Sequence, residues 1–165
     1  MAVRPNALPW LWLSAAVIAL DQLTKWLALA ALQPYMPHAV IPGLLNWTLA
    51  FNTGAAFSFL AEADGWQRWF FAALAVIVSA VLAAWLARTA RRDWRSALPL
   101  ALVVGGALGN LIDRLRLGHV VDFIQVYWQQ WAWPAFNLAD SAISVGAVLL
   151  IAFGLFGGKA APAGR

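Results

Sequence analysis

The feature that most constrains this chain is a run of nineteen residues without a charge, from Trp69 to Ala87. A helix of this length crosses the hydrocarbon core of a bilayer, which is roughly 30 Å thick. Over the whole chain, 63% of the residues are hydrophobic and 11% are charged. This composition is typical of a membrane protein and argues against a soluble globular domain.

Three further hydrophobic segments accompany this run, and we expect transmembrane helices at about 8–32, 69–87, 96–114 and 137–156. The four segments and their connecting loops use up the chain, so we treat 1–165 as a single domain. Arginines at positions 88, 91, 92 and 95 follow the second segment and place its end in the cytoplasm. Four spans then put both termini in the cytoplasm and the segments 33–67 and 115–136 on the outer face.

The first segment carries charged residues in its second half. Asp21 and Lys25 are four residues apart, so they share a helical face and can neutralise each other before burial. A carboxylate that is already paired is a poor base. We therefore assign both residues a structural role, as a brace to neighbouring helices. Because the apolar run resumes after Lys25, we interpret the segment as a retained transmembrane helix and not as a signal peptide.

The pattern changes between the first and second spans. Prolines and a glycine between positions 34 and 43 interrupt any helix, and 45–51 is rich in strand formers. We expect a small β-sheet or hairpin over about 34–60, on the membrane surface. It leads into a run of small residues at 52–58, where Gly54 would let the backbone approach a ligand and Asn52 can donate and accept hydrogen bonds. Taken alone, such a run is more often a turn that enters a short helix.

Two acidic residues, Asp122 and Asp140, stand at the edges of hydrophobic segments on the outer face. A carboxylate near hydrocarbon costs about 2.5 to 3.5 kcal/mol even on lenient scales, so it is rare without a partner or a task. Two neighbouring carboxylates cannot both ionise cheaply, so one keeps a proton and the pair offers a general base and a general acid. The pair could therefore activate a water for attack on a carbonyl group.

Other chemistries lack the residues that they need. The chain has no cysteine and only two histidines, His38 and His119, so we expect no metal site and no cofactor. Neither histidine lies near a well-placed serine, which argues against a serine nucleophile. The net charge of +4 comes from basic residues between apolar runs. Membrane lipids explain these residues better than nucleic acid does.

The two acids also have a structural interpretation, in which Asp122 tethers a loop and Asp140 is a buried acid paired with Arg114 or Arg116. Helical spacing places Asn110, Asp113 and Arg114 on one face of the third span, and Asn137 with Asp140 on one face of the fourth. We expect these two faces to meet. Spacing alone does not separate the structural from the catalytic interpretation.

Five motifs follow one another over nearly the whole chain: Asp-Gln-Leu-Thr-Lys at 21–25, Asn-Thr-Gly-Ala-Ala-Phe-Ser at 52–58, Gly-Gly-Ala-Leu-Gly-Asn-Leu-Ile-Asp-Arg at 105–114, Val-Val-Asp-Phe at 120–123 and Phe-Asn-Leu-Ala-Asp-Ser at 136–141. In this order they resemble the bacterial lipoprotein signal peptidase, or signal peptidase II, family.

The resemblance implies an aspartyl endopeptidase of the bacterial inner membrane, with four transmembrane helices, a small extracytoplasmic β-sheet and a short surface helix. Its substrates would be prolipoproteins that carry diacylglycerol on a cysteine, cut just before that cysteine. Asp122 and Asp140 match the catalytic pair. The residues expected around the substrate are Asn52, Gly54, Asn110, Asp113, Arg114 and Asn137. We expect the protein to act at the outer, periplasmic face as a monomer among membrane lipids.

Two other functions compete with this interpretation. A transporter could use Asp113, Asp122 and Asp140 as a proton or cation relay, although the hydrophobic segments show no internal repeat and the acids gather at one face. An assembly factor could dock partner helices on the small residues Gly105 and Gly109.

Overall fold

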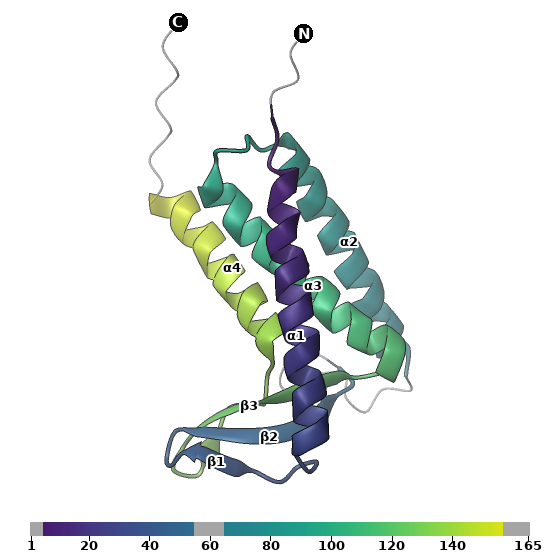
Figure 1. Cartoon of the computed structure of the whole chain (residues 1–165), viewed down its shortest axis with the longest axis vertical. Coiled ribbons are helices and arrows are strands. Elements are labelled where there is room, and N and C mark those ends of the chain that lie inside the picture. Colours follow the sequence, from purple (N-terminus) through teal and green to yellow (C-terminus); the bar gives the residue numbers. More distant parts are fainter. Residues whose placement is uncertain (1–4, 55–64, 157–165) are drawn as a thin grey trace, which may run out of the picture.

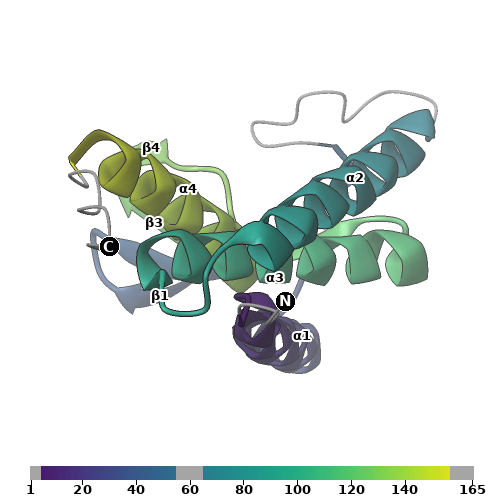
Figure 2. The ribbon, with the colours of Figure 1, turned by 90° about the horizontal axis from the view of Figure 1, so that it is seen from above.

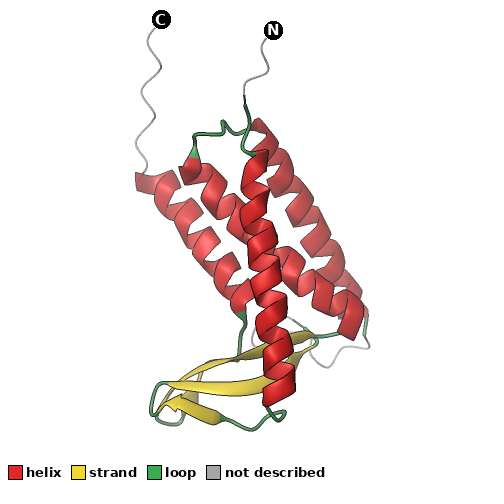
Figure 3. Ribbon diagram, viewed as in Figure 1, coloured by secondary structure: helices red, strands yellow, loops and turns green. Residues whose placement is uncertain are grey.

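The computed structural model describes residues 5–54 and 65–156, which form a bundle of helices above a small β-sheet (Figures 1 and 3). The long helices are α1 (Leu11–Ala31), α2 (Trp66–Arg88), α3 (Trp94–Leu117) and α4 (Leu138–Phe156), and a 3-10 turn, Leu8–Trp10, leads into α1. The strands are β1 (His38–Ile41), β2 (Leu45–Asn52), β3 (Val120–Trp128) and β4 (Trp131–Ala132). In the described part of the chain, four helical segments are long and apolar enough to cross a membrane, which confirms the predicted fold class.

Helix α3 is the centre of the bundle and packs against α1, α2 and α4 (Figure 2). Its apolar stretch is 67% buried within the protein, against 17% to 28% for the other three spans. The outer helices expose large apolar side chains such as Trp12, Val81 and Ile151, as lipid-facing helices do. Any polar side chain on the covered faces of α3 is therefore shielded from lipid.

Glycines on α3 let its neighbours approach closely. A Cβ atom on Gly105 would lie 2.8 Å from the Cβ of Val17 on α1, and one on Gly109 would lie 2.8 Å from Oδ2 of Asp21 and 3.3 Å from the Cβ of Ala139. Gly105 and Gly109 therefore form a small-residue packing face within the chain, and Gly109 brings α1 and α4 together at one level of α3.

The sheet lies at one end of the bundle, and the α2–α3 connection lies at the other (Figure 1). Its strands are antiparallel in the order β1-β2-β3-β4. Strand β2 pairs with β3, which is far away in the sequence, so that Ala50 lies opposite Asp122. This pairing carries Asp122 to the sheet-side ends of α3 and α4.

Some predicted boundaries need correction. Helix α2 begins three residues earlier than expected and α3 ends three residues later. The sheet is not confined to 34–60, because β3 and β4, from the outer segment 115–136, complete it. Val120 to Phe123 are all buried, so β3 lacks the alternation by which a half-exposed strand is recognised. The short surface helix expected after the small-residue run lies outside the described residues, which end at 54 and resume at 65.

Candidate active site

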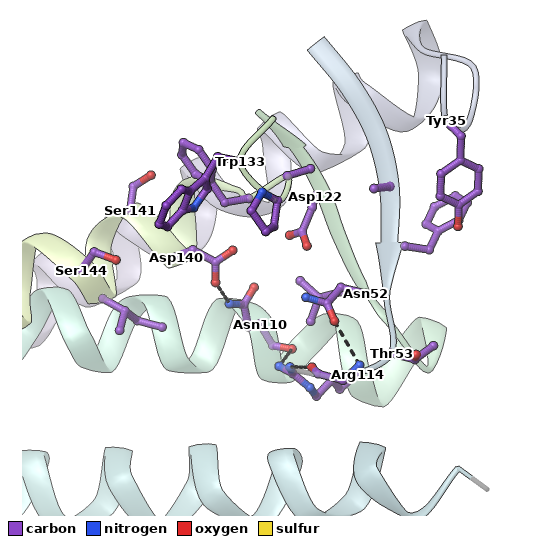
Figure 4. A pocket seen from close by; sticks show the side chains of 18 of the residues that line it. Tyr35, Asn52, Thr53, Asn110, Arg114, Asp122, Trp133, Asp140, Ser141 and Ser144 are labelled. Atoms are coloured by element: carbon purple, nitrogen blue, oxygen red, sulfur yellow. Dashed lines mark hydrogen bonds between the residues drawn. The ribbon is translucent and has the colours of Figure 1, made fainter. Parts of the chain in front are cut away.

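A cavity of about 820 Å³ lies where the sheet meets α3 and α4. Its polar lining includes Asn52 from β2, Asn110 and Arg114 from α3, Asp122 from β3 and Asp140 from α4. Figure 4 shows the carboxylates of Asp122 and Asp140 directed into the same space. Gly54, just after β2, also lines the cavity, so the two predicted acids and four of the predicted binding residues are brought together from distant parts of the chain.

Asp122 is held in β3 with only 2% of its surface exposed. One carboxylate oxygen, Oδ1, accepts a hydrogen bond of 2.7 Å from the side-chain amide of Asn137. Burial, and secondly the charge of Asp140, raise the pKa of Asp122 to about 7, while the amides of Asn52 and Asn137 and the charge of Lys25 act in the opposite direction. Asp122 therefore exchanges a proton near neutral pH.

Asp140 is the third residue of α4, and it forms a reciprocal cap with Asn137, the residue before the helix. The backbone N–H of Asp140 donates to Oδ1 of Asn137 (2.9 Å), and the backbone N–H of Asn137 donates to Oδ2 of Asp140 (3.2 Å). This is the capping-box arrangement, with Asn and Asp in the two capping positions. The other oxygen, Oδ1, accepts from the side-chain amide of Asn110 at 2.7 Å. Both carboxylate oxygens of Asp140 are thus oriented by hydrogen bonds.

The structural interpretation of Asp140 required an arginine partner. Among the described residues, both ion pairs are made by Lys25, and neither Arg114 nor Arg116 takes part in one. The partner of Asp140 is instead a neutral amide, that of Asn110.

A buried charge cluster lies behind the cavity. The ammonium nitrogen of Lys25 is 2.8 Å from Oδ2 of Asp21, as the spacing predicted, and also 2.8 Å from Oδ2 of Asp113. Oδ1 of Asp21 accepts from the backbone N–H of Ala139 (2.9 Å), so α1 caps the start of α4. Asp113 accepts from the backbone N–H of Val121 and does not line the cavity, although we expected it at the substrate. Asp113 fixes the start of β3 from behind.

Asn137 is also behind the cavity wall, with 0% of its surface exposed. Its amide N–H₂ group faces Asp122, the carbonyl oxygen of Val121 and Oδ1 of Asn110. It therefore connects the two acids and does not contact the cavity directly.

On the opposite side of the cavity, Arg114 meets the segment that follows β2. Its guanidinium donates to the carbonyl oxygen of Gly54 (3.1 Å) and lies over the ring of Phe71. Asn52 accepts from the backbone N–H of Gly54 (3.0 Å). Gly54 is thus held between two polar side chains at the cavity edge.

Several residues of the cavity wall were not predicted from the sequence. Aromatic and aliphatic side chains form part of the wall, including Phe51, Phe136 and Ile143, and two hydroxyl residues of α4, Ser141 and Ser144, join them. Ser141 and Ser144 lie four and seven residues after Asn137, so helical periodicity would have placed them on the same face. For the apolar wall, the sequence offers no comparable signal. In the described part of the chain, no group of three acidic, histidine or cysteine side chains could hold a metal ion.

Comparison with known proteins now decides the family. A family model for signal peptidase (SPase) II matches residues 13–156. The chain belongs to the signal peptidase II family. It is 62% identical over 161 residues to the lipoprotein signal peptidase of Xanthomonas campestris pv. campestris (strain 8004), covering 96% of each chain. It is 58% identical over 159 residues to that of Xylella fastidiosa (strain M12), covering 96% of this chain and 95% of the relative.

The fold of this signal peptidase II is also found among solved structures. A bacterial membrane enzyme solved at 2.3 Å resolution superposes with a TM-score of 0.80 and 27% sequence identity, covering 99% of this chain and 98% of that one. A second bacterial membrane enzyme, solved at 1.9 Å resolution, superposes with a TM-score of 0.77 and 28% sequence identity, covering 96% of this chain and 99% of that one. The protein is therefore a multi-pass bacterial membrane protease of lipoprotein processing.

Proposed function

We propose that this protein removes the signal peptide from diacylglyceryl-modified prolipoproteins by aspartyl proteolysis, cutting just before the lipidated cysteine. The observation that carries the proposal is the placement of Asp122 and Asp140 in one cavity, each bound to an asparagine amide. The pKa of Asp122 near 7 is that of a group able to exchange a proton at working pH.

In the proposed mechanism, the two carboxyl groups share one proton at rest. The ionised carboxylate takes a proton from a water molecule as the water oxygen bonds to the carbonyl carbon of the scissile peptide. The protonated carboxyl group gives its proton to the carbonyl oxygen as its negative charge develops. When the tetrahedral intermediate collapses, the C–N bond breaks, the leaving nitrogen takes up a proton from one carboxyl group, and a hydroxyl group of the intermediate returns its proton to the other, which restores the shared proton. No acyl-enzyme forms.

The side of the cavity formed by Arg114, Asn52 and Gly54, its open side, is proposed to hold the substrate backbone. Arg114 has a buried Nε–H without a hydrogen-bond partner in the described residues, and such a donor suits a peptide carbonyl oxygen. Asn52 and Gly54 lie at the same edge, where the Asn52 side-chain amide and the second lone pair of the Gly54 carbonyl oxygen can bond a peptide. Asn110 lines the cavity, whereas Asn137 and Asp113 support it from behind.

The proposed membrane orientation follows from the positions of charge and cavity. The arginine-rich α2–α3 connection is assigned to the cytoplasm by the positive-inside rule, which puts the sheet and the cavity at the outer face of the inner membrane and both termini inside. The cavity wall continues along α4 through Ile143 and Val145, where acyl chains of a laterally diffusing substrate can lie. One domain, acting as a monomer among membrane lipids, is sufficient for this reaction.

The test is cleavage of a purified diacylglyceryl-modified prolipoprotein by the wild-type protein and by Asp122→Asn and Asp140→Asn. Each variant should insert, remain folded and bind substrate, yet lose turnover by about 10³-fold or more. Asp93→Asn, at the far end of α3, is the matched control and should cleave normally. Turnover near the wild-type value in either cavity variant would contradict the paired-aspartate mechanism.

A further inference from the structure

Lys25 makes one contact that charge pairing does not explain. Only 2% of the surface of Lys25 is exposed. Its ammonium group reaches three oxygen atoms: Oδ2 of Asp21 (2.8 Å), Oδ2 of Asp113 (2.8 Å) and Oδ1 of Asn110 (2.9 Å). An ammonium group has three hydrogens, so its whole donor capacity is used. Two bonds neutralise carboxylates, and the third goes to a neutral amide that lines the cavity.

That third bond fixes which way the Asn110 amide points. Lysine only donates, so the Asn110 atom facing it must be the oxygen, and the N–H₂ group must then face the other way. On that other side lies Oδ1 of Asp140, at 2.7 Å from the Asn110 nitrogen. The orientation imposed by Lys25 is therefore the one that supplies Asp140 with a donor.

The remaining restraint on this amide is weaker. The side-chain nitrogen of Asn137 also faces Oδ1 of Asn110, at 3.2 Å. However, this nitrogen carries two hydrogens and faces three acceptors, and its shortest contact is with Asp122 at 2.7 Å. Lys25 is thus the main group that holds the Asn110 oxygen away from Asp140.

We infer that Lys25 is a positioning residue for the reaction, which acts through Asn110 to hold a hydrogen-bond donor on Asp140. The inference rests on the proposed aspartyl mechanism. When Lys25 is absent, the Asn110 oxygen loses its charged donor, so the amide can rotate or shift and its N–H₂ group no longer holds the Asp140 carboxylate in the productive position. Lys25 then affects the rate of the chemical step and not only the amount of folded protein.

The test variant must not leave an unbalanced buried charge. In Lys25→Met/Asp113→Asn, one ammonium and one carboxylate are removed together, so the formal charge of the cluster is unchanged. Its reference is Asp113→Asn, which differs from it only at Lys25. The structural control is Gln22→Met on the same helix, because Gln22 donates to Asp113 (2.8 Å) and to the carbonyl oxygen of Gly109 but has no bond to Asn110.

We expect the double variant to cleave the lipidated substrate with a kcat about 10- to 100-fold below its reference and with KM nearly unchanged, as is typical when a partner that orients a functional group is lost. Gln22→Met should lower the thermal midpoint while its kcat per folded protein stays at the wild-type value. Lys25→Gln/Asp113→Asn still offers an amide donor toward Asn110 and should recover part of the lost kcat.

Three outcomes would overturn the inference. These are a kcat of the double variant equal to its reference, an equal loss of kcat in Gln22→Met, and failure of both Lys25 variants to fold while Gln22→Met folds. None of these results bears on Asp122 or Asp140, whose asparagine variants test the aspartyl mechanism separately.

Discussion

The two sides of the cavity use the same kinds of polar group in different ways. On the buried side, Lys25 donates to Asn110, Asn110 donates to Asp140 and Asn137 donates to Asp122. On the open side, Arg114 keeps a buried Nε–H that has no partner in the part of the chain described. Polar groups whose hydrogen bonds are all made within the protein fix the positions of the two acids, whereas a donor without a partner is available to a ligand.

This difference separates two kinds of mutational effect. Changes on the buried side should alter the stability of the protein or its kcat, because they move the acids. Changes on the open side should alter KM, because they remove contacts that only the substrate completes. The following predictions test that division, beginning with the largest effect.

Asp21→Ala should produce the largest loss of stability. It breaks a buried ion pair and removes the cap that α1 provides to α4 at Ala139, at a cost of about 3 to 5 kcal/mol in the free energy of unfolding. Denaturant titration in detergent micelles measures this cost. The matched control is Thr24→Ala, because the Thr24 hydroxyl bonds only to carbonyl oxygens of its own helix among the contacts described. Similar losses of unfolding free energy in Asp21→Ala and Thr24→Ala would show that the buried charge cluster adds no more stability than a hydrogen bond within one helix.

The rate of cleavage should fall as the pH rises above about 7. The pKa of Asp122 is raised from 3.8 to about 7, and above this pH the pair loses its shared proton, so the rate drops about tenfold per pH unit. Between about pH 4 and pH 7 the folded protein holds a proton that the unfolded chain releases. The contribution of Asp122 to stability is therefore present below pH 4 and lost as the pH rises through 7. A cleavage rate that is flat or rising from pH 6 to pH 8 would contradict this assignment.

Arg114→Lys should raise KM about tenfold and change kcat little, because a lysine cannot reproduce the planar set of donors of the guanidinium group. Steady-state kinetics with the lipidated substrate measures both constants. Arg68→Lys is the control, since Arg68 binds the carbonyl oxygen of Leu115 and does not line the cavity. A loss confined to kcat would place Arg114 with the buried side.

Asp93→Ala should have the smallest effect. Oδ1 of Asp93 accepts from the backbone N–H of Ser96 at the start of α3, and loss of such a cap costs about 1 kcal/mol. This helix end is far from the cavity, so kcat and KM should not change. Thermal unfolding and steady-state kinetics, on separate portions of one preparation, measure the stability and the two kinetic constants. A changed kcat would mean that a loss of stability at this end of α3 reaches the acids.

Much of the fold was predictable because hydrophobic length alone specifies a membrane span. The predicted spans agree with the helices to within three residues at each boundary. Strand β3 was missed because Val120 to Phe123 are buried on both sides, and its pairing with β2 depends on residues distant in the sequence. No local pattern encodes either property.

The candidate site, like the fold, could be predicted from the sequence only in part. Asp122 and Asp140 stand out in the sequence because charge next to an apolar run is rare. Asp113 was expected beside them, since it shares a helical face with Asn110, but that face meets α1 as well as the cavity, and Asp113 turns toward Lys25. The cap between Asn137 and Asp140 has a sequence signal, because an asparagine stands three residues before an acid at the start of an apolar run.

The paired-aspartate mechanism requires a carboxyl group in the cavity that keeps its proton near neutral pH. Infrared titration of the folded protein in detergent observes this proton. We expect a carboxyl C=O band that disappears with a midpoint at about pH 7 and that is absent from Asp122→Asn. A spectrum with no protonated carboxyl band above pH 5, or a band that persists unchanged in Asp122→Asn, would contradict it.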